Sequence, residues 1–271
     1  MDKYNVLLLQ PPGEEPSFEF LEVARLLTHS LRSLGKTCDL RVNEATGGEV
    51  NILLGYHLLR PGFTPAADLD YVVYQLQPLS NGGEKLVEQH GELLRRARAV
   101  WDYAPENVAV LERHGLTKVG LLPIGYHAAL RKIQPRAEEI DILCEGSSGR
   151  CDSVLNELGR SHRVEKLAGV YGDSRDAYIA RSKIVLSVAS HEGDPLDQVR
   201  ISYLLNNGRL VIGERLAANP YENAVVSGSF RELAELCRRY LGDATERTRV
   251  AQRGFALFRQ RAMVEHLKKV L

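Results

Sequence analysis

The stretch that decides the fold is residues 140–160, IDILCEGSSGRCDSVLNELGR. Ile140–Cys144 is a short apolar run of the kind found in a strand that is buried on both faces. A turn of Gly146, Ser147, Ser148 and Gly149 follows it, and Cys151–Arg160 has the pattern of a helix. Strand, turn and helix together predict one βα unit of a parallel sheet.

Similar units extend in both directions along the chain. Earlier strands are expected at Asn5–Gln10, Thr37–Val42, Val50–Leu54, Tyr71–Gln75, Ala99–Trp101 and Val119–Leu122, and later ones at Val164–Leu167, Ile184–Val188 and Leu210–Ile212. The expected helices between and after them include Glu84–Arg98, a helix capped by Ser229 with Glu232 three residues on, and a last helix from about Thr245 to Leu271. The alternation predicts an α/β fold with doubly wound parallel sheets.

The segment Gly125–Glu139 carries turn residues, several charges and no strong period. We expect the interdomain linker there, because the alternation of apolar runs and helices restarts after it. The sequence therefore predicts two Rossmann-like domains, residues 1–127 and 128–271.

Composition excludes several classes of function. The 271 residues contain 35 Lys and Arg and 35 Asp and Glu, so the net charge is zero and no overall field favours nucleic acid. No apolar run is long enough to span a membrane, and the start lacks the long apolar core of a signal peptide. No G-x-G-x-x-G follows a strand, which disfavours a dehydrogenase.

Four cysteines, Cys38, Cys144, Cys151 and Cys237, form no C-x-x-C pair and have no histidine at metal-ligand spacing. This pattern disfavours a zinc site or a disulfide framework and predicts a reduced, cytoplasmic compartment.

Several pieces of the later sequence resemble the GT-B glycosyltransferases. The stretch 97–115, followed by 118–127 with its Pro-x-Gly turn, is similar to the interdomain crossing of that fold. Ser190–Gly193 is similar to its SxxEG piece, and Asn207-Gly208 precedes a strand as it does there. The pieces 180–184 and 199–205 are closer to the CgeB-like, spore-maturation-type branch. The resemblance covers roughly residues 97–271.

The resemblance implies two domains that face a central cleft, with the C-terminal helix crossing back to the first. It implies a transferase that moves a sugar from a nucleotide diphosphate to a hydroxyl acceptor, with the nucleotide sugar as substrate and no cofactor. No DxD triplet of the metal-binding kind occurs, so no metal is expected. The alternative is a non-catalytic nucleotide- or glycan-binding module with a degenerate GT-B fold. The sugar, the base, the acceptor and the oligomeric state stay open.

The donor site is expected at the ends of the later strands. Gly146, Ser147 and Ser148 precede a helix, where backbone N–H groups suit a diphosphate, although an ordinary βα turn has the same composition. By resemblance, Tyr171 and Gly172 lie in the loop that packs beside the nucleotide base, with Tyr171 as the stacking candidate.

The loop of His191, Glu192 and Gly193 matches the family's acidic loop, and Glu192 corresponds to the glutamate near the donor sugar. Eight residues later stands Arg200, where many GT-B enzymes have a glutamate for the ribose. Arg200 can hold a phosphate with two hydrogen bonds and is preferred among the nearby cations, which are Arg150, Arg175 and Arg181.

Two Gly-Tyr-His triplets, 55–57 and 125–127, follow expected strands. His57 is predicted to be the base that removes a proton from the acceptor hydroxyl near neutral pH. Asp102 is an alternative base. By resemblance, His127 is expected to line the floor of the cleft.

Overall fold

The computed structural model describes residues 3–10, 18–80, 82–146, 148–189, 197–215, 219–221 and 223–271. The chain divides into two compact units. Unit 1 comprises Met1–His127 and Ala262–Leu271, and unit 2 comprises Ala128–Arg261.

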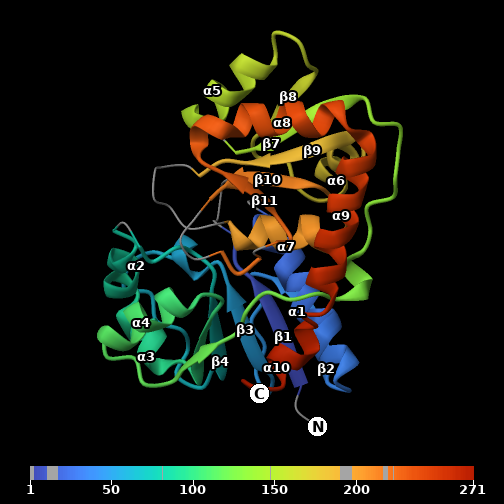
Figure 1. Cartoon of the computed structure of the whole chain (residues 1–271). Coiled ribbons are helices and arrows are strands. Elements are labelled where there is room, and N and C mark those ends of the chain that lie inside the picture. The colour runs from blue at the N-terminus through green and yellow to red at the C-terminus, as the bar shows by residue number, and fades with distance from the viewer. Residues whose placement is uncertain are drawn as a thin grey trace. The chain divides into compact units, whose positions relative to one another are not determined.

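Unit 1 is built on a parallel sheet with the strand order β2-β1-β3-β4-β5-β6 (Figure 1). Its strands are β1 (Lys3–Leu8), β2 (Thr37–Val42), β3 (Val50–Leu54), β4 (Tyr71–Gln75), β5 (Ala99–Asp102) and β6 (Val119–Leu121). Its helices are α1 (Leu21–Ser33), the 3-10 turn η1 (Tyr56–Leu58), α2 (Glu84–Gln89), α3 (Gly91–Arg96), α4 (Pro105–Arg113) and α10 (Met263–Leu267).

The faces of this sheet are covered by different helices. Helix α1 packs on β1, β2 and α10, whereas α4 packs on β5 and β6. Successive residues of a strand point to opposite faces, so Leu7 and Leu53, which are paired in register, share one face. They join the buried cluster that includes Val73, Leu93 and Leu111.

Unit 2 repeats this plan with the strand order β11-β10-β9-β7-β8, again with parallel pairing throughout its described residues. Its strands are β7 (Ile140–Glu145), β8 (Val164–Leu167), β9 (Ser182–Ser187), β10 (Val211–Glu214) and β11 (Val226–Gly228). Its helical elements are η2 (Ala128–Leu130), α5 (Gly149–Leu158), α6 (Gly172–Ala180), α7 (Gln198–Asn206), η3 (Phe230–Glu232), α8 (Leu233–Gly242) and α9 (Ala244–Arg259).

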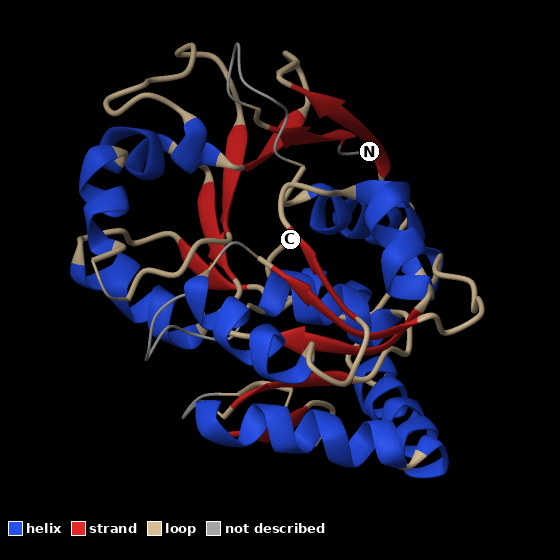
Figure 2. Ribbon diagram, turned by 90° about the horizontal axis from the view of Figure 1, so that it is seen from above, coloured by secondary structure: helices blue, strands red, loops and turns tan. Residues whose placement is uncertain are grey.

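Helices flank the strands in each unit, as Figure 2 shows. In unit 2 the cluster around Ile142, Ile184 and Ile212 is sealed by Leu155 of α5 and Cys237 of α8. The α/β prediction with parallel sheets is confirmed. The capping box at Ser229 is confirmed too, because the Glu232 carboxylate accepts a hydrogen bond of 2.7 Å from the Ser229 N–H.

Two expected helices are each broken into two. The stretch Glu84–Arg98 is interrupted at His90, which is 2% exposed and packs edge-on against the Tyr56 ring at 5.4 Å. The expected last helix ends at Arg259 and restarts at Met263. Between them Ala262 forms a parallel bridge with Tyr126, and the Met263 N–H donates to the Tyr126 carbonyl at 2.9 Å. Tertiary contacts therefore override local helix propensity at both breaks.

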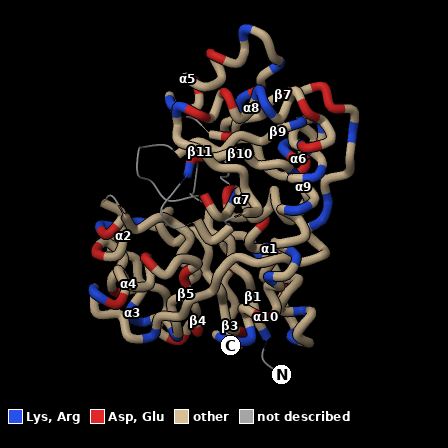
Figure 3. The backbone as a smooth tube through the Cα atoms, viewed as in Figure 1, with Lys and Arg blue, Asp and Glu red and all other residues tan. Residues whose placement is uncertain are grey.

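Lys and Arg residues are interspersed with Asp and Glu along the described chain of each unit (Figure 3), in keeping with the balanced composition. In the described ranges, no helix has both the length and the apolar character that crossing a membrane requires.

The cysteine prediction needs a correction, because Cys144 at the end of β7 and Cys151 in α5 are joined in a disulfide, while Cys38 and Cys237 are free and buried. The two cysteines are seven residues apart, and the short connection from β7 to α5 brings them together.

The packing of α9 gives a test of the fold of unit 2. A Cβ added at Gly254 would lie 2.5 Å from the carbonyl oxygen of Ala224, whereas one at Gly242 would meet nothing within 4 Å. We expect Gly254→Ala to lower the free energy of unfolding by about 1–3 kcal/mol through overpacking. Gly242→Ala, the matched control, is expected to be neutral or to stabilise by up to about 1 kcal/mol. Urea denaturation measures both, and equal effects would contradict the close approach of α9 to Ala224.

Candidate functional site

The turn between β7 and α5 lies at the carboxyl edge of the unit 2 sheet. Gly146 has φ 132°, a conformation that favours glycine, and its N–H donates to the Leu167 carbonyl of β8 at 2.8 Å. Ser148 caps α5, since its Oγ accepts from the Cys151 N–H at 3.3 Å. The first N–H groups of α5 have no carbonyl partner within the helix, and with the helix dipole they form an environment that suits an anion.

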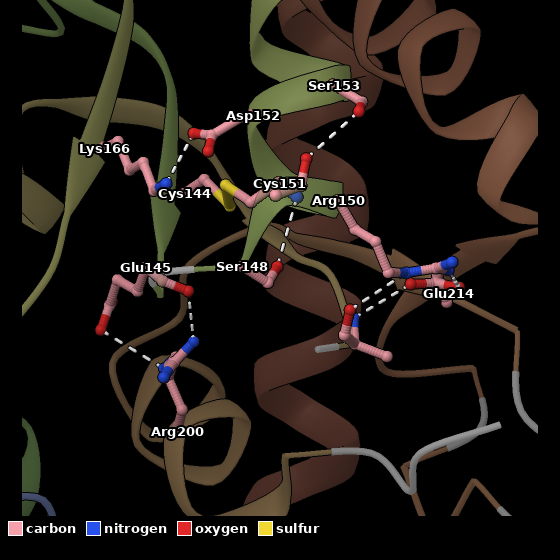
Figure 4. The surroundings of a disulfide bond; sticks show 12 residues. Cys144, Glu145, Ser148, Arg150, Cys151, Asp152, Ser153, Lys166, Arg200 and Glu214 are labelled. Carbon is pink, nitrogen blue, oxygen red and sulfur yellow. Dashed lines mark hydrogen bonds and ion pairs between the residues drawn. A yellow bond between two sulfur atoms is a disulfide. The ribbon is translucent and has the colours of Figure 1, made fainter. Parts of the chain in front are cut away.

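Arg200 of α7 lies directly beside this turn (Figure 4). A Cβ on Gly146 would be 3.8 Å from its Nη1. Nη1 donates to the Glu145 carbonyl at 2.5 Å, and Nε lies 3.5 Å from the Glu145 carboxylate. Nη2 lies 3.3 Å from the carboxylate of Asp197, the N-cap residue of α7. The structure therefore places Arg200 beside the turn, where it faces two carboxylates.

A second guanidinium borders the same turn. Arg150, in the first turn of α5, donates to the Glu214 carboxylate at 2.5 Å and to the Ala189 carbonyl at 3.2 Å. Its Cζ lies 4.2 Å from the centroid of the Phe230 ring. Glu214 ends β10 and also accepts from the Ala189 N–H at 3.0 Å. Arg150 thus ties α5 to the carboxyl ends of β9 and β10.

Of the other two cations, Arg181 lies at the opposite edge of the sheet and Arg175 lies in α6. Arg181 directly precedes β9, at the amino end of that strand, where its Nη1 lies 3.3 Å from Glu139. Arg175 is 6% exposed within α6, with its Cζ 4.8 Å from the centroid of the Tyr203 ring. Of the cations that the sequence singled out, Arg150 and Arg200 therefore lie beside the turn, and Arg181 does not.

Tyr171 and Gly172 follow β8, the strand that pairs with β7. Tyr171 is the N-cap residue of α6, and Gly172, with φ 60°, is the first residue of that helix. Both are half-buried. Gly146, Ser148, Tyr171, Gly172 and Arg200 thus all follow carboxyl ends of strands in one sheet.

Four predicted site residues, Ser147, His191, Glu192 and Gly193, lie outside the described residues. Conversely, sequence reasoning missed the three carboxylates that hold the arginines, on Glu145, Asp197 and Glu214. Glu145 and Glu214 each follow an apolar run directly, so their position at strand carboxyl ends was a usable signal.

In unit 1, His57 lies in η1 after β3. Its ring packs edge-on against Phe20 at 5.7 Å, and its Nε2 is 3.2 Å from Nε2 of Gln77. Because the amide nitrogen can only donate, His57 Nε2 accepts this bond and Nδ1 carries the proton. Burial, with a smaller effect of His90, lowers the pKa of His57 to about 4, so the ring is neutral at pH 7.

Asp102 is fully buried at the end of β5. It accepts from the Ala104 N–H at 2.8 Å and from Gln75 Nε2 at 3.2 Å. Burial raises its pKa to about 8, against the opposing effect of these hydrogen bonds. His127, in the second Gly-Tyr-His triplet, has Nε2 3.0 Å from the Ser33 hydroxyl and stacks on His29 at 5.8 Å. Burial and then His29 lower the pKa of His127.

Across the ranges that the structure describes, no group of three or more His, Cys, Asp or Glu is placed to hold a metal ion.

Comparisons with known proteins bear on the fold. No family model and no curated protein sequence matches the chain. Among solved structures, HepE of Anabaena in complex with UDP-glucose is similar, with a TM-score of 0.63, 12% identity and 98% of each chain covered. Sucrose-phosphate synthase of Thermosynechococcus elongatus has a TM-score of 0.61 at 13% identity, covering 99% of this chain and 98% of its own. An alpha-glucosyltransferase in complex with UDP and a 13-mer DNA has a TM-score of 0.65 at 8% identity, covering 98% of this chain and 99% of its own.

The environment of His57 can be tested by its titration. We expect the NMR signal of His57, assigned by its loss in His57→Gln, to titrate near pH 4. Because the folded pKa lies below the ordinary value of 6.5, the unfolded chain binds more protons between these values. The stability contributed by neutral His57 is thus present above pH 6.5 and lost as the pH falls towards 4. A midpoint near 6.5 would contradict the buried setting.

The similar structures are GT-B glycosyltransferases, and the parallel sheets with flanking helices match theirs over nearly the whole chain. The chain therefore has the GT-B fold.

Proposed function

We propose that this chain is a glycosyltransferase that moves a sugar from a nucleotide diphosphate to a hydroxyl acceptor. The observation that carries the proposal is the Gly146–Ser148 turn at the N-terminus of α5, bordered by Arg150 and Arg200. Backbone N–H groups and two guanidinium groups are the donors that a diphosphate requires, and they would stabilise the charge that develops on it as it leaves. HepE, which has the same fold, is known in complex with UDP-glucose and with UDP.

Binding would proceed by exchange of partners. Arg200 holds Glu145 and Asp197, and Arg150 holds Glu214. Phosphate oxygens would replace some of these carboxylate contacts, because a guanidinium has five N–H donors in a fixed fork. Tyr171 would stack on the base, and Glu192 would contact the donor sugar. The reaction would need no metal, since the arginines and the helix end supply the positive charge.

Two narrower assignments belong to the same proposal. The chain would fall in the CgeB-like branch, for which the support is the sequence of residues 180–184 and 199–205. His57 would act as the base, supported by its place directly after β3.

Substitution of Arg200 tests the donor site. We expect Arg200→Ala to weaken UDP binding, measured by calorimetry, by roughly 10- to 100-fold through the loss of charged hydrogen bonds. If the positive charge of Arg200 supplies most of the affinity, Arg200→Lys should retain part of it. If the two parallel hydrogen bonds of the guanidinium supply most of it, Arg200→Lys should bind UDP as weakly as Arg200→Ala. Arg181→Ala, at the amino end of β9, is the matched control and should bind UDP as the wild type does. Wild-type affinity in Arg200→Ala would remove Arg200 from the site.

A turnover assay distinguishes an enzyme from a non-catalytic binding module. With UDP-glucose and an acceptor, we expect release of UDP, and His57→Ala should slow it by roughly 10²- to 10⁴-fold with UDP binding nearly intact. His114→Ala, at the C-terminal end of α4, is the control and should retain turnover. Unchanged turnover in His57→Ala would exclude His57 as the base. A wild-type chain that binds UDP and transfers sugar from no UDP-, GDP- or dTDP-linked donor would instead establish the non-catalytic module.

A further inference from the structure

Unit 1 contains a cavity of about 570 Å³ that the donor site does not use. Its origin lies in two chain connections, because the link from β2 to β3 carries no helix and the link from β3 to β4 carries only a short one. The link from β4 to β5 carries α2 and α3, and the link from β5 to β6 carries α4, whereas in the link from β3 to β4 the described helical structure is the short η1 alone. The sheet face over β1 and β3 is covered by loop instead of by a crossover helix, and a space remains beneath that loop.

Apolar side chains form most of the cavity wall. Leu7 and Leu53, paired in register and each 3% exposed, form its floor. Leu59, Phe63 and Leu69, from the loop between β3 and β4, are half-buried and line its sides. The volume lies within the range of about 300–1,000 Å³ that is typical of small-molecule sites with apolar linings.

Polar groups also line the cavity, on Gln10, Asn43 and Asp68. Asn43 holds the end of β1, because its Oδ1 accepts from the Gln10 N–H at 2.8 Å and its Nδ2 donates to the Gln10 carbonyl at 3.3 Å. Asp68 is exposed, and its carboxylate can accept a hydrogen bond from a hydroxyl. The arrangement of apolar walls with a few polar groups is the one that orients an amphiphilic ligand.

We propose that this cavity binds the hydrocarbon part, alkyl or aryl, of an uncharged acceptor whose hydroxyl receives the sugar. The identification of the ligand as the acceptor rests on the proposed function. The hydrocarbon character of the ligand is inferred from the cavity alone. An uncharged ligand is favoured because burying a charge against leucine and phenylalanine side chains carries a large desolvation cost. Leu59 is two residues beyond His57, so the cavity wall and the proposed base belong to one chain segment.

Enlarging a side chain that lines the cavity, with the adjacent residue as the control, tests whether the cavity binds a ligand. Ala66 and Ala67 are both exposed, and Ala66 is the one that lines the cavity. The probe is N-phenyl-1-naphthylamine, an uncharged aryl compound whose fluorescence rises in apolar surroundings, titrated without any nucleotide sugar. We expect Ala66→Trp to weaken probe binding by about tenfold or more, and Ala67→Trp to leave it at the wild-type value.

A polarity change gives a second, independent variant. Leu59→Gln places an amide in the cavity wall, and Leu121→Gln, at a leucine that is 41% exposed, is its control. We expect the first to weaken probe binding and the second to leave it unchanged, with thermal unfolding showing that all four variants are folded. Absence of probe binding in the wild type, or equal binding in each variant and its control, would overturn the cavity as a ligand site.

The acceptor role has its own readout. 1-Naphthol, which carries a hydroxyl on an aryl group, should displace the probe and accept the sugar, whereas glycerol should not displace it. If UDP-glucose is hydrolysed but 1-naphthol neither displaces the probe nor is glycosylated, the acceptor assignment is wrong and the proposed function stands. If none of UDP, GDP and dTDP binds while the probe does, the proposed function fails, the acceptor assignment fails with it, and the cavity is established as an apolar site alone.

Discussion

Parallel pairing of buried strands is the constraint on which the donor site depends. Because β7, β8, β9 and β10 run in the same direction, their carboxyl ends meet at one edge, and the loops that follow them converge there. The turn at Gly146, the N-cap at Tyr171 and the carboxylate of Glu214 are far apart in the chain and share this edge for that reason alone. A change of direction in one strand would send its loop to the opposite edge, where Arg181 lies.

Carboxylates hold the two arginines in place before any donor arrives. Glu145 and Asp197 orient Arg200, while Glu214 orients Arg150. The Glu145 side chain is 8% exposed, so its ion pair is less screened by solvent than a surface pair would be. These ion pairs hold the long, flexible arginine side chains in place. A bound diphosphate would therefore have to replace carboxylate contacts of the two arginines. Affinity for a diphosphate should accordingly reflect the difference between phosphate and carboxylate as hydrogen-bond acceptors, and not the full strength of the phosphate contacts.

In unit 1 the β2–β3 and β3–β4 connections carry no α-helix, and one part of the sheet is therefore covered by loops. Where α2, α3 and α4 are present, they bury the sheet face completely, and Val73 and Leu111 are 0% exposed. Over β1 and β3 the loop covers the same kind of face incompletely, and the cavity results. At the end of β5, where the face is closed, buried Asp102 accepts a hydrogen bond from buried Gln75.

The sequence by itself determined the α/β class, the positions of most strands, the Ser229 cap and the candidate turn at Gly146–Ser148. These follow from local signals, namely apolar periodicity, glycine and serine at turns, and capping spacing, which need no knowledge of distant residues. Only the tertiary structure decided that Arg150 and Arg200 border the turn while Arg181 does not, that Cys144 meets Cys151, and that the last helix breaks at Ala262. The approach of Arg200 to the turn and of Ala262 to Tyr126 depends on contacts between residues far apart in the chain, which leave no mark on local composition. The Cys144–Cys151 pair is only seven residues apart and depends on how β7 is joined to α5.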